Sequence, residues 1–269
     1  MKHFVLDIDI CNGCYCCQVA CKDEHVANDW MPYAKPQPDT GQFWIKLREQ
    51  VRGTVPKVKV TYTPLMCMHC TDAACMTACT PGAIYRREDG LVVIDPAKCT
   101  GCMLCPDACQ YGAIYFNEDL NIAQKCTGCA HLLDDGWQEP RCVDACPTGA
   151  LRFAEESDLK EQIARAEPLR DEKPGTTIVH YLNLPKKFVA GTVYDPVEKE
   201  VIIGAVCTLK SSDGKETYKV ETDNFGDFWF HGLSEGQNYA LVISTAHAQK
   251  TIALALTEDL NLGDIALRA

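Results

Sequence analysis

The feature that most constrains the fold of this chain is a dense run of cysteines at residues 99–109, with the sequence CTGCMLCPDAC. Its four cysteines follow the spacing Cys-x2-Cys-x2-Cys-x3-Cys. In runs of this kind a tight turn brings the first three thiolates onto one iron–sulfur cubane, while the fourth lies further along a short helix and ligates a neighbouring cluster. The run therefore predicts at least one partner run in the same chain.

Three further groups of four cysteines supply such partners. The first repeats the same spacing, the second is two residues longer, and the last contains a twelve-residue gap. They are Cys11, Cys14, Cys17 and Cys21; Cys67, Cys70, Cys75 and Cys79; and Cys126, Cys129, Cys142 and Cys146. With Cys99, Cys102, Cys105 and Cys109 they use sixteen of the eighteen cysteines as iron ligands and predict four [4Fe-4S] clusters.

Disulfide bonds and structural zinc are the alternative uses of so many cysteines. Disulfides belong to oxidising compartments, and residues 1–10 lack the charged and apolar regions of a signal peptide. Zinc sites use paired Cys-x2-Cys knuckles, and only the group from Cys126 to Cys146 resembles one. Two intact Cys-x2-Cys-x2-Cys-x3-Cys runs favour iron–sulfur clusters over both.

The distribution of cysteines also divides the chain into two predicted domains. Seventeen of the eighteen precede residue 147, whereas the residues from Phe188 onward form seven short apolar–polar stretches separated by turns such as Ser212-Asp213-Gly214. Such stretches are typical of a β-sandwich. We expect a cluster-binding domain over 1–180, with an insertion at about 22–66, a linker over Asp171–Thr177, and a seven-stranded sandwich over 186–269.

Internal repeats relate the cysteine groups to one another. Lys98-Cys99-Thr100-Gly101-Cys102 and Lys125-Cys126-Thr127-Gly128-Cys129 are nearly identical pentads, and the fourth cysteine of several groups leads into a strand-like segment such as Gly112-Ala113-Ile114. The units resemble duplicated halves of bacterial ferredoxins. The predicted class is therefore α+β, with tandem ferredoxin-like folds followed by an all-β sandwich.

The ferredoxin resemblance implies which cysteines share a cluster, because the fourth ligand crosses over between paired motifs. If the first motif pairs with the fourth and the second with the third, four ligand sets follow. They are Cys11, Cys14, Cys17 and Cys146; Cys21, Cys126, Cys129 and Cys142; Cys67, Cys70, Cys75 and Cys109; and Cys79, Cys99, Cys102 and Cys105.

Several reactive or charged residues lie beside these ligands or outside the four groups. They are Cys16 and Cys207, His69 and His131, and Lys22, Lys98 and Lys125. The two cysteines are expected to be inert small apolar residues, with thiol sensing as the alternative. The histidines pack or donate a hydrogen bond to sulfur. The lysines offset cluster charge, reach a partner's cofactor, or are plain solvated charges.

Charge and hydropathy argue against nucleic acid as a partner and against a membrane-spanning segment. The formal net charge of -11 disfavours nucleic-acid binding, and no apolar run approaches the roughly 18 residues needed to cross a bilayer. The chain also shows no nucleophile triad, phosphate-binding loop or dinucleotide motif, so no catalysis by this chain alone is expected. We expect a cytoplasmic protein, or one exported with a partner that carries a twin-arginine signal.

From Met1 to about residue 155 the chain resembles the four-cluster iron–sulfur subunits of molybdopterin oxidoreductases of the dimethyl sulfoxide reductase family. The four cysteine groups carry this resemblance. It implies an electron-transfer subunit whose large catalytic partner holds a molybdenum or tungsten bis-pterin cofactor.

A narrower resemblance rests on REDGLVVIDP at 87–96, AQKCTGCAHLLDD at 123–135 and the appended sandwich. Together they are similar to small subunits of the pyrogallol–phloroglucinol transhydroxylase group, which includes aromatic hydroxylases and dehydroxylases, and whose sandwich is transthyretin-like or carboxypeptidase-regulatory-like. The implied substrate is a polyhydroxylated aromatic. The alternatives are a subunit of a respiratory reductase for polysulfide, tetrathionate, arsenate or a sulfoxide, and a free polyferredoxin.

Overall fold

The computed structural model describes residues 1–169 and 176–268, which form two compact units. The first comprises Met1–Glu49 and Tyr62–Leu184, and the second comprises Gln50–Thr61 and Pro185–Ala269. Residues 50–61 fall within the insertion expected in the first domain, but their contacts place them with the second unit. Most of the predicted linker, residues 171–175, lies outside the described residues.

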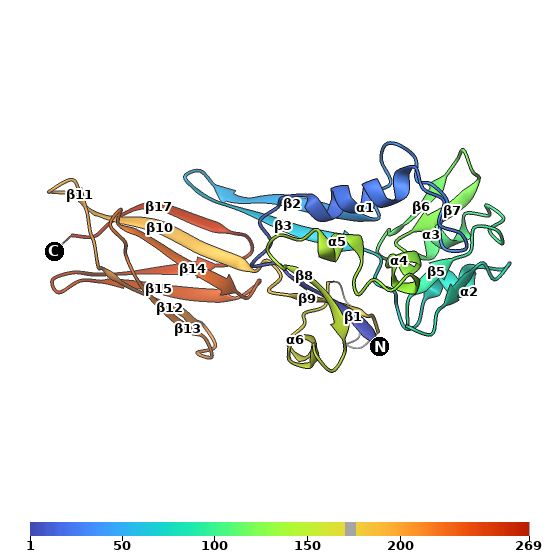
Figure 1. Ribbon diagram of the computed structural model, residues 1–269. Helices are drawn as coiled ribbons and strands as arrows, with labels where there is room; N and C mark the ends of the chain where they lie inside the picture. Colours follow the sequence, from blue (N-terminus) through green and yellow to red (C-terminus); the bar gives the residue numbers. More distant parts are fainter. Residues whose placement is uncertain (170–175, 269) are drawn as a thin grey trace. The chain divides into compact units, whose positions relative to one another are not determined.

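A three-stranded sheet joins the two ends of the cysteine-rich region in the first unit (Figure 1). Its central strand β1 (Lys2–Asp7) pairs antiparallel with β8 (Leu151–Glu155) and parallel with β9 (Val179–Leu182). Because β1 precedes the first cysteine group and β8 follows the last, the sheet brings these outer groups together. Phe4 and Leu6 of β1 are fully buried and anchor this sheet in the main core.

The two inner cysteine groups each contain a short helix and are each followed by a hairpin. The helices are α2 (Ala74–Ala78) and α3 (Leu104–Ala108), and the hairpins are β4 (Ile84–Arg86) with β5 (Val92–Ile94) and β6 (Ile114–Asn117) with β7 (Ile122–Lys125). Apolar residues of both hairpins, including Ile84, Ile94 and Ile114, share one buried cluster with Cys105. The two inner repeats therefore pack on each other.

Four further helices belong to the first unit. They are α1 (Cys16–Val26), α4 (Ala130–Asp134), α5 (Arg141–Asp144) and α6 (Lys160–Ala164).

An ion pair of Arg87 with Asp134, 2.7 Å between nitrogen and oxygen, ties the β4–β5 turn to the end of α4. Asp89 also accepts from Arg87, and Tyr33 donates to Asp134. Hydrogen bonding from Arg87, then from Tyr33, lowers the pKa of Asp134.

The second unit is a sandwich of two four-stranded sheets. One contains β10 (Lys187–Asp195), β11 (Glu200–Val201), β14 (Asp227–Leu233) and β17 (Leu260–Ala266); the other contains β12 (Val206–Ser211), β13 (Thr217–Glu221), β15 (Asn238–Ser244) and β16 (Gln249–Ala255). Buried residues from both sheets, such as Val189, Phe228 and Leu241, form one core. The seven expected strands are present, and within the described residues 186–268 the two-residue β11 is an eighth.

A long hairpin of β2 (Ile45–Thr54) and β3 (Lys57–Met66) contributes its outer residues to the second unit. Arg52 binds both carboxylate oxygens of Asp259, at 2.8 and 2.7 Å, and Lys57 pairs with Asp227. These buried or half-buried ion pairs explain why residues 50–61 belong with the sandwich strands rather than with the cysteine-rich unit.

Candidate iron–sulfur sites

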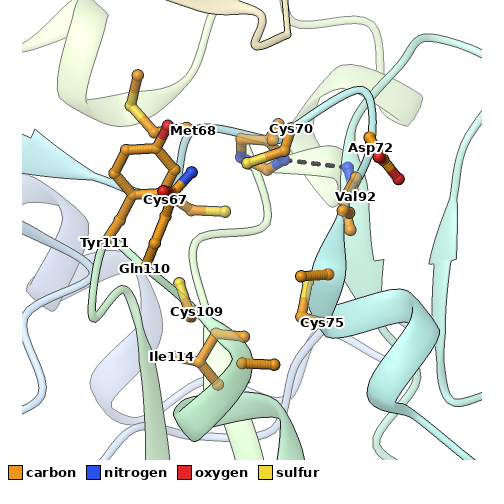
Figure 2. Close-up of a pocket in the computed structure, with 14 residues that line it drawn as sticks. Cys67, Met68, Cys70, Asp72, Cys75, Val92, Cys109, Gln110, Tyr111 and Ile114 are labelled. Atoms are coloured by element: carbon orange, nitrogen blue, oxygen red, sulfur yellow. Dashed lines mark hydrogen bonds between the residues drawn. The ribbon is translucent and has the colours of Figure 1, made fainter. Parts of the chain in front are cut away.

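The structure gathers the sixteen predicted ligands into four sets, each mixing cysteines from two groups. One set lines a pocket of about 300 Å³: Cys67, Cys70 and Cys75 come from the second group, and Cys109 comes from the third (Figure 2). We call this set the Cys67 site. The backbone N–H of Ala113 donates to the Cys109 sulfur at 3.5 Å.

In the second set, three cysteines come from the third group and the fourth comes from the second group. Cys99, Cys102 and Cys105 line a pocket together with Cys79, and we call this set the Cys79 site. The backbone N–H of Ala123 donates to the Cys99 sulfur at 3.4 Å. The second and third groups therefore exchange their last cysteines.

The outer groups exchange their last cysteines in the same way. Cys21 from α1 lines a pocket with Cys126, Cys129 and Cys142, here called the Cys21 site. The remaining set, the Cys11 site, consists of Cys11, Cys14, Cys17 and Cys146. Burial, then the charges of Cys11 and Cys146, raises the pKa of Cys17 to about 12, which shows that these thiols are close neighbours.

Backbone N–H groups point at sulfur in the Cys11 site as well. Burial acts to raise the pKa of Cys146, but N–H groups of Leu151, Thr148 and Ala150, together with the Thr148 hydroxyl, outweigh burial and lower it. Donors directed at sulfur stabilise a thiolate, the form that ligates metal. The turn between Cys146 and β8 thus prepares this cysteine for ligation.

Neighbouring sites follow one another in a fixed order through shared elements. Cys17 and Cys21 lie one turn apart on α1 and connect the Cys11 site to the Cys21 site. Nearby sulfur charges raise the pKa values of Cys126 beside Cys67 and of Cys105 beside Cys75, although burial is the larger cause in each. The order is therefore Cys11 site, Cys21 site, Cys67 site and Cys79 site.

Two buried ring nitrogens test whether these pockets suit a sulfur-rich group. Trp44, only 2% exposed, lines the Cys21 site, and its indole N–H has no partner among the described residues. His69 is fully buried and lines the Cys67 site, where its Nε2 is likewise unpaired within the described part of the chain. Because an unpaired buried donor is costly, a sulfur acceptor in each pocket would satisfy it. The residues fit an iron–sulfur cluster.

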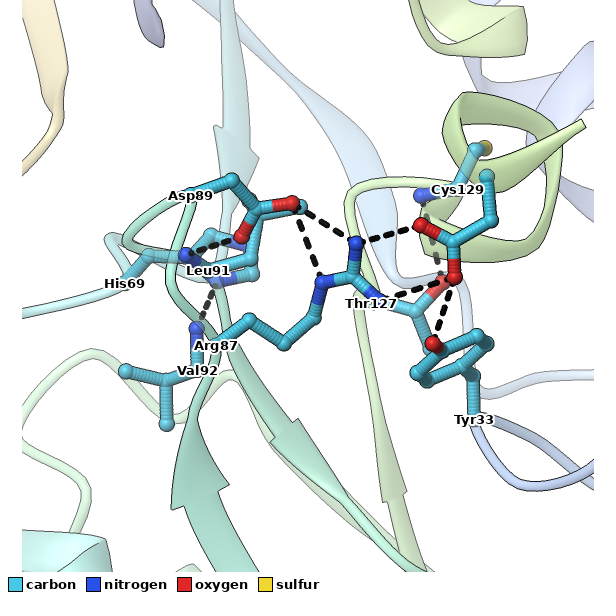
Figure 3. Close-up of polar contacts among 9 residues, drawn as sticks. Tyr33, His69, Arg87, Asp89, Leu91, Val92, Thr127 and Cys129 are labelled. Atoms are coloured by element: carbon cyan, nitrogen blue, oxygen red, sulfur yellow. Dashed lines mark hydrogen bonds and ion pairs between the residues drawn. The ribbon is translucent and has the colours of Figure 1, made fainter. Parts of the chain in front are cut away.

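The tautomer of His69 follows from its other nitrogen. The backbone N–H of Val92 donates to His69 Nδ1 at 3.0 Å, so the ring proton lies on Nε2 (Figure 3). Burial, then the charge of Lys125, holds the pKa of His69 well below its ordinary value, and the ring is neutral. His69 is therefore a neutral N–H donor in the Cys67 site.

His69 also occupies a turn position that glycine holds in the other groups. Gly101 and Gly128 have φ values of 71° and 63°, and a Cβ at Gly128 would lie 2.6 Å from Leu91. His69 has the same left-handed backbone, with φ 45°. A left-handed non-glycine residue costs roughly 1–2 kcal/mol. The sequence signal for a special role of His69 was therefore the replacement of this glycine.

The remaining residues singled out from the sequence have divergent environments. Cys207 is fully buried in the sandwich core, and burial raises its pKa to about 12, whereas Cys16 is only half-buried at the start of α1. All eighteen cysteines lie within the described residues, and none forms a disulfide bond there. His131 bonds Glu24 at 3.0 Å and stacks on Trp30, so it packs beside the ligands and does not line a described cysteine pocket.

The three lysines also differ. The ammonium group of Lys22 donates to the backbone carbonyls of Pro38 and Gly41. Lys98 is exposed and pairs with Asp95 at 3.2 Å, while Lys125 is buried. Lys98 therefore matches the prediction of a solvated charge, whereas Lys125 matches the prediction of a charge near a cluster, although both lysines precede a cysteine in nearly identical pentads.

Comparison with known proteins supports the binding of iron–sulfur clusters by the first unit. Residues 58–156 match the 4Fe-4S dicluster domain family, and residues 189–268 match the carboxypeptidase regulatory-like domain family. The pyrogallol hydroxytransferase small subunit of Pelobacter acidigallici is 37% identical over 87% of this chain and 88% of its own length. The chain belongs to the iron–sulfur subunit family of dimethyl sulfoxide reductase-type enzymes.

Other members of this iron–sulfur subunit family match the first half of the chain. One is a component of the anaerobic dimethyl sulfoxide reductase of Escherichia coli, 36% identical over 52% of this chain and 66% of its own length. Another is a component of the sulfite dehydrogenase of Allochromatium vinosum, 32% identical over 52% of this chain and 62% of its own length. As in these relatives, the chain is an electron-transfer subunit, and catalysis belongs to a larger partner.

Two further findings complete the comparison. The pilin subunit BcpA of Bacillus cereus aligns with 34% of the chain and 31% of its own length, at 16% identity and a TM-score of 0.28, which is too low to indicate a shared fold. Within residues 1–169 and 176–268, the helices are all too short or too polar to traverse a bilayer.

Proposed function

We propose that the chain carries four [4Fe-4S] clusters, one in each site, and transfers electrons along them. The observation that supports this most is the exchange of fourth cysteines, which places four thiols in each site. When bound, each cluster accepts and releases single electrons. The chain's own residues hold the ligands and supply N–H donors to sulfur.

Exposure of the ligands supports a relay with two accessible ends. Cys14 in the Cys11 site and Cys102 in the Cys79 site are the exposed cysteines, whereas the Cys21 and Cys67 sites lie between them. Apolar side chains stand uncovered near both ends: Val19 is 63% exposed, and Met103 is 51% exposed. An electron would enter at one end and leave at the other, where partner proteins can approach.

We further propose that the catalytic partner is a large subunit with a molybdenum or tungsten pterin cofactor that acts on a polyhydroxylated aromatic. The extent of the similarity favours this partner over a respiratory one. The match to the pyrogallol hydroxytransferase small subunit covers 87% of the chain, whereas the matches to dimethyl sulfoxide reductase and sulfite dehydrogenase relatives cover 52% to 66%. Transhydroxylation, hydroxylation and dehydroxylation all fall within this class. Because all sixteen predicted ligands are present and can conduct electrons through four clusters, a reaction with net electron transfer is favoured over transhydroxylation.

A respiratory reductase is the second candidate function. The arsenate respiratory reductase iron–sulfur subunit of Shewanella sp. strain ANA-3 is 39% identical, but over 42% of this chain. The third candidate is a free polyferredoxin. Location follows the partner, in the cytoplasm or exported with a twin-arginine signal.

The deciding experiment is anaerobic purification of the tagged chain from its native host with everything that binds it. Four cubanes require 4 × 4 = 16 iron atoms per chain, and a pterin subunit adds one molybdenum or tungsten. We expect about sixteen iron atoms or slightly more, one such metal, and turnover of a polyhydroxylated aromatic such as pyrogallol.

Other results would redirect the proposal. About eight iron atoms would mean that only two sites are filled. A pterin partner that reduces dimethyl sulfoxide or arsenate, and leaves aromatics unchanged, would establish the respiratory function. Full iron without any partner or pterin metal would identify a free carrier of about the size of this 29.8 kDa chain.

A further inference from the structure

Lys125 is a buried lysine at the end of β7 whose ammonium group faces two of the candidate sites. It is 2% exposed. Its Nζ contacts the Cys67 sulfur at 3.4 Å, the Cys126 carbonyl oxygen at 3.0 Å, and the Val92 carbonyl oxygen. Cys67 belongs to the Cys67 site and Cys126 to the Cys21 site, so Lys125 stands between two neighbouring sites.

The three contacts match the three donors of an ammonium group. All three partners are acceptors, and an ammonium group has three donors and no acceptor. Lys125 therefore presents a full positive charge to the Cys67 sulfur. Among the residues that the structure describes, no carboxylate pairs with it, in contrast to Lys98 with Asp95.

An unpaired buried cation is costly, because it has lost water without gaining a counter-charge. Two carbonyl dipoles compensate only in part. A [4Fe-4S] core held by four thiolates carries a net negative charge of about -2 when oxidised and about -3 after one electron is added. The cluster would thus be the missing counter-charge, and the attraction to Lys125 would strengthen when the electron arrives.

We propose that Lys125 raises the reduction potential of the cluster in the Cys67 site, making this inner site a more favourable resting place for the electron. The inference rests on the proposed function, since it needs a cluster there. The step is the uptake of one electron by the oxidised cluster, supplied in a titration by dithionite through redox mediators. No bond is formed or broken. The charge of Lys125 acts through the Cys67 sulfur that it contacts.

The repeat provides a matched control. Lys98 precedes Cys99 just as Lys125 precedes Cys126, in nearly identical pentads. Its side chain is 61% exposed and already paired with Asp95. Exposed charges are screened by water and salt. Removal of Lys98 should therefore leave the potentials almost unchanged, although its place in the local sequence is the same.

The test is a redox titration followed by electron paramagnetic resonance on the intact complex, for the wild type, Lys125→Met, Lys125→Arg and Lys98→Met. Cys70→Ser identifies the signal of the Cys67 site, because that signal is the one it alters. We expect Lys125→Met to make reduction of that cluster at least tenfold less favourable, which is a shift of about 59 mV to lower potential for one electron. Lys125→Arg, which keeps the charge, should retain most of the wild-type potential.

Iron content separates the failure of this inference from the failure of the proposed function. If Cys70→Ser alters no signal of the wild-type protein, the assignment of a cluster to the Cys67 site is wrong. If Lys125→Met retains its iron and the potential of that signal does not move, Lys125 does not set the potential. If Lys125→Met fails to assemble, Lys125→Gln, which is neutral but polar, carries the same test with the same expected shift.

Discussion

Replacing Asp259 by asparagine should destabilise the second unit strongly, because it removes the counter-charge of Arg52. The side chains of Asp259 and Arg52 are 8% and 14% exposed and form two charge-assisted hydrogen bonds of 2.7 and 2.8 Å. Asp259 also accepts the backbone N–H of Phe188 at 3.0 Å. The pair therefore joins the β2–β3 turn to β10 of the sandwich.

The structure sets the size of the expected loss. Breaking a buried ion pair by removing one partner typically costs about 3–5 kcal/mol, because the other charge stays buried. The Lys186 carbonyl also accepts from Arg52 and keeps part of its hydrogen bonding. We therefore expect the lower end of the range, about 3 kcal/mol. Replacing both residues by apolar ones, as Arg52→Met with Asp259→Leu, should be close to neutral.

Hydrogen exchange measured by mass spectrometry on the full chain resolves this effect by segment. A loss of about 3 kcal/mol should speed exchange of the amides in β10 and β17 by about 10². The control is Lys215→Met, which removes an exposed pair with Asp213, 82% and 39% exposed. Surface pairs contribute about 0–1 kcal/mol, so its exchange should barely change.

Two outcomes would refute the reasoning. If Asp259→Asn exchanges like the wild type, the pair does not fasten the turn to the sandwich. If Asp259→Asn and the double replacement are equally destabilised, the loss comes from packing or from the Phe188 contact rather than from an uncompensated charge.

Two further predictions concern the first unit. Cys146→Ser should abolish the same cluster signal as Cys14→Ser, and Cys142→Ser the same signal as Cys21→Ser; a shared loss for Cys142 and Cys146, which are only four residues apart, would contradict the exchange of ligands. Burial, then the charge of His3, lowers the pKa of His180 to about 4, so the unfolded chain binds more protons between about pH 6.5 and 4 and stability should fall with falling pH across that window, by up to about 1.4 kcal/mol per pH unit. Denaturant unfolding at several pH values should show a shallower dependence for His180→Phe, and an unchanged slope would exclude this histidine as the cause.

Local sequence was sufficient for several features of the fold. Cysteine spacing indicated the cluster-type turns, because ligands a few residues apart must lie on one turn. Period-two alternation indicated seven sandwich strands, since each needs one face toward a core. The eighth, β11, has only the two exposed residues Glu200 and Val201, so it left no pattern to detect.

The grouping of ligands between distant motifs did not follow from spacing. Cys142 and Cys146 are four residues apart yet belong to different sites, and only resemblance to ferredoxins suggested this in advance. The pairing of β1 with β8 explains part of the grouping physically, because it brings the first and last cysteine groups together. The assignment of residues 50–61 also depended on contacts across about two hundred residues, such as Arg52 with Asp259.

The two lysine pentads show most clearly what sequence and tertiary structure each decide. The sequence by itself determined that Lys98 and Lys125 both precede a predicted ligand in the same turn. It did not determine that Lys98 is solvated beside Asp95 while Lys125 is buried against Cys67. The effect of a charge depends on how much water surrounds it and on which distant groups face it. Those conditions are set by tertiary packing, which brings Val92 and Cys67 to Lys125 and leaves Lys98 at the surface.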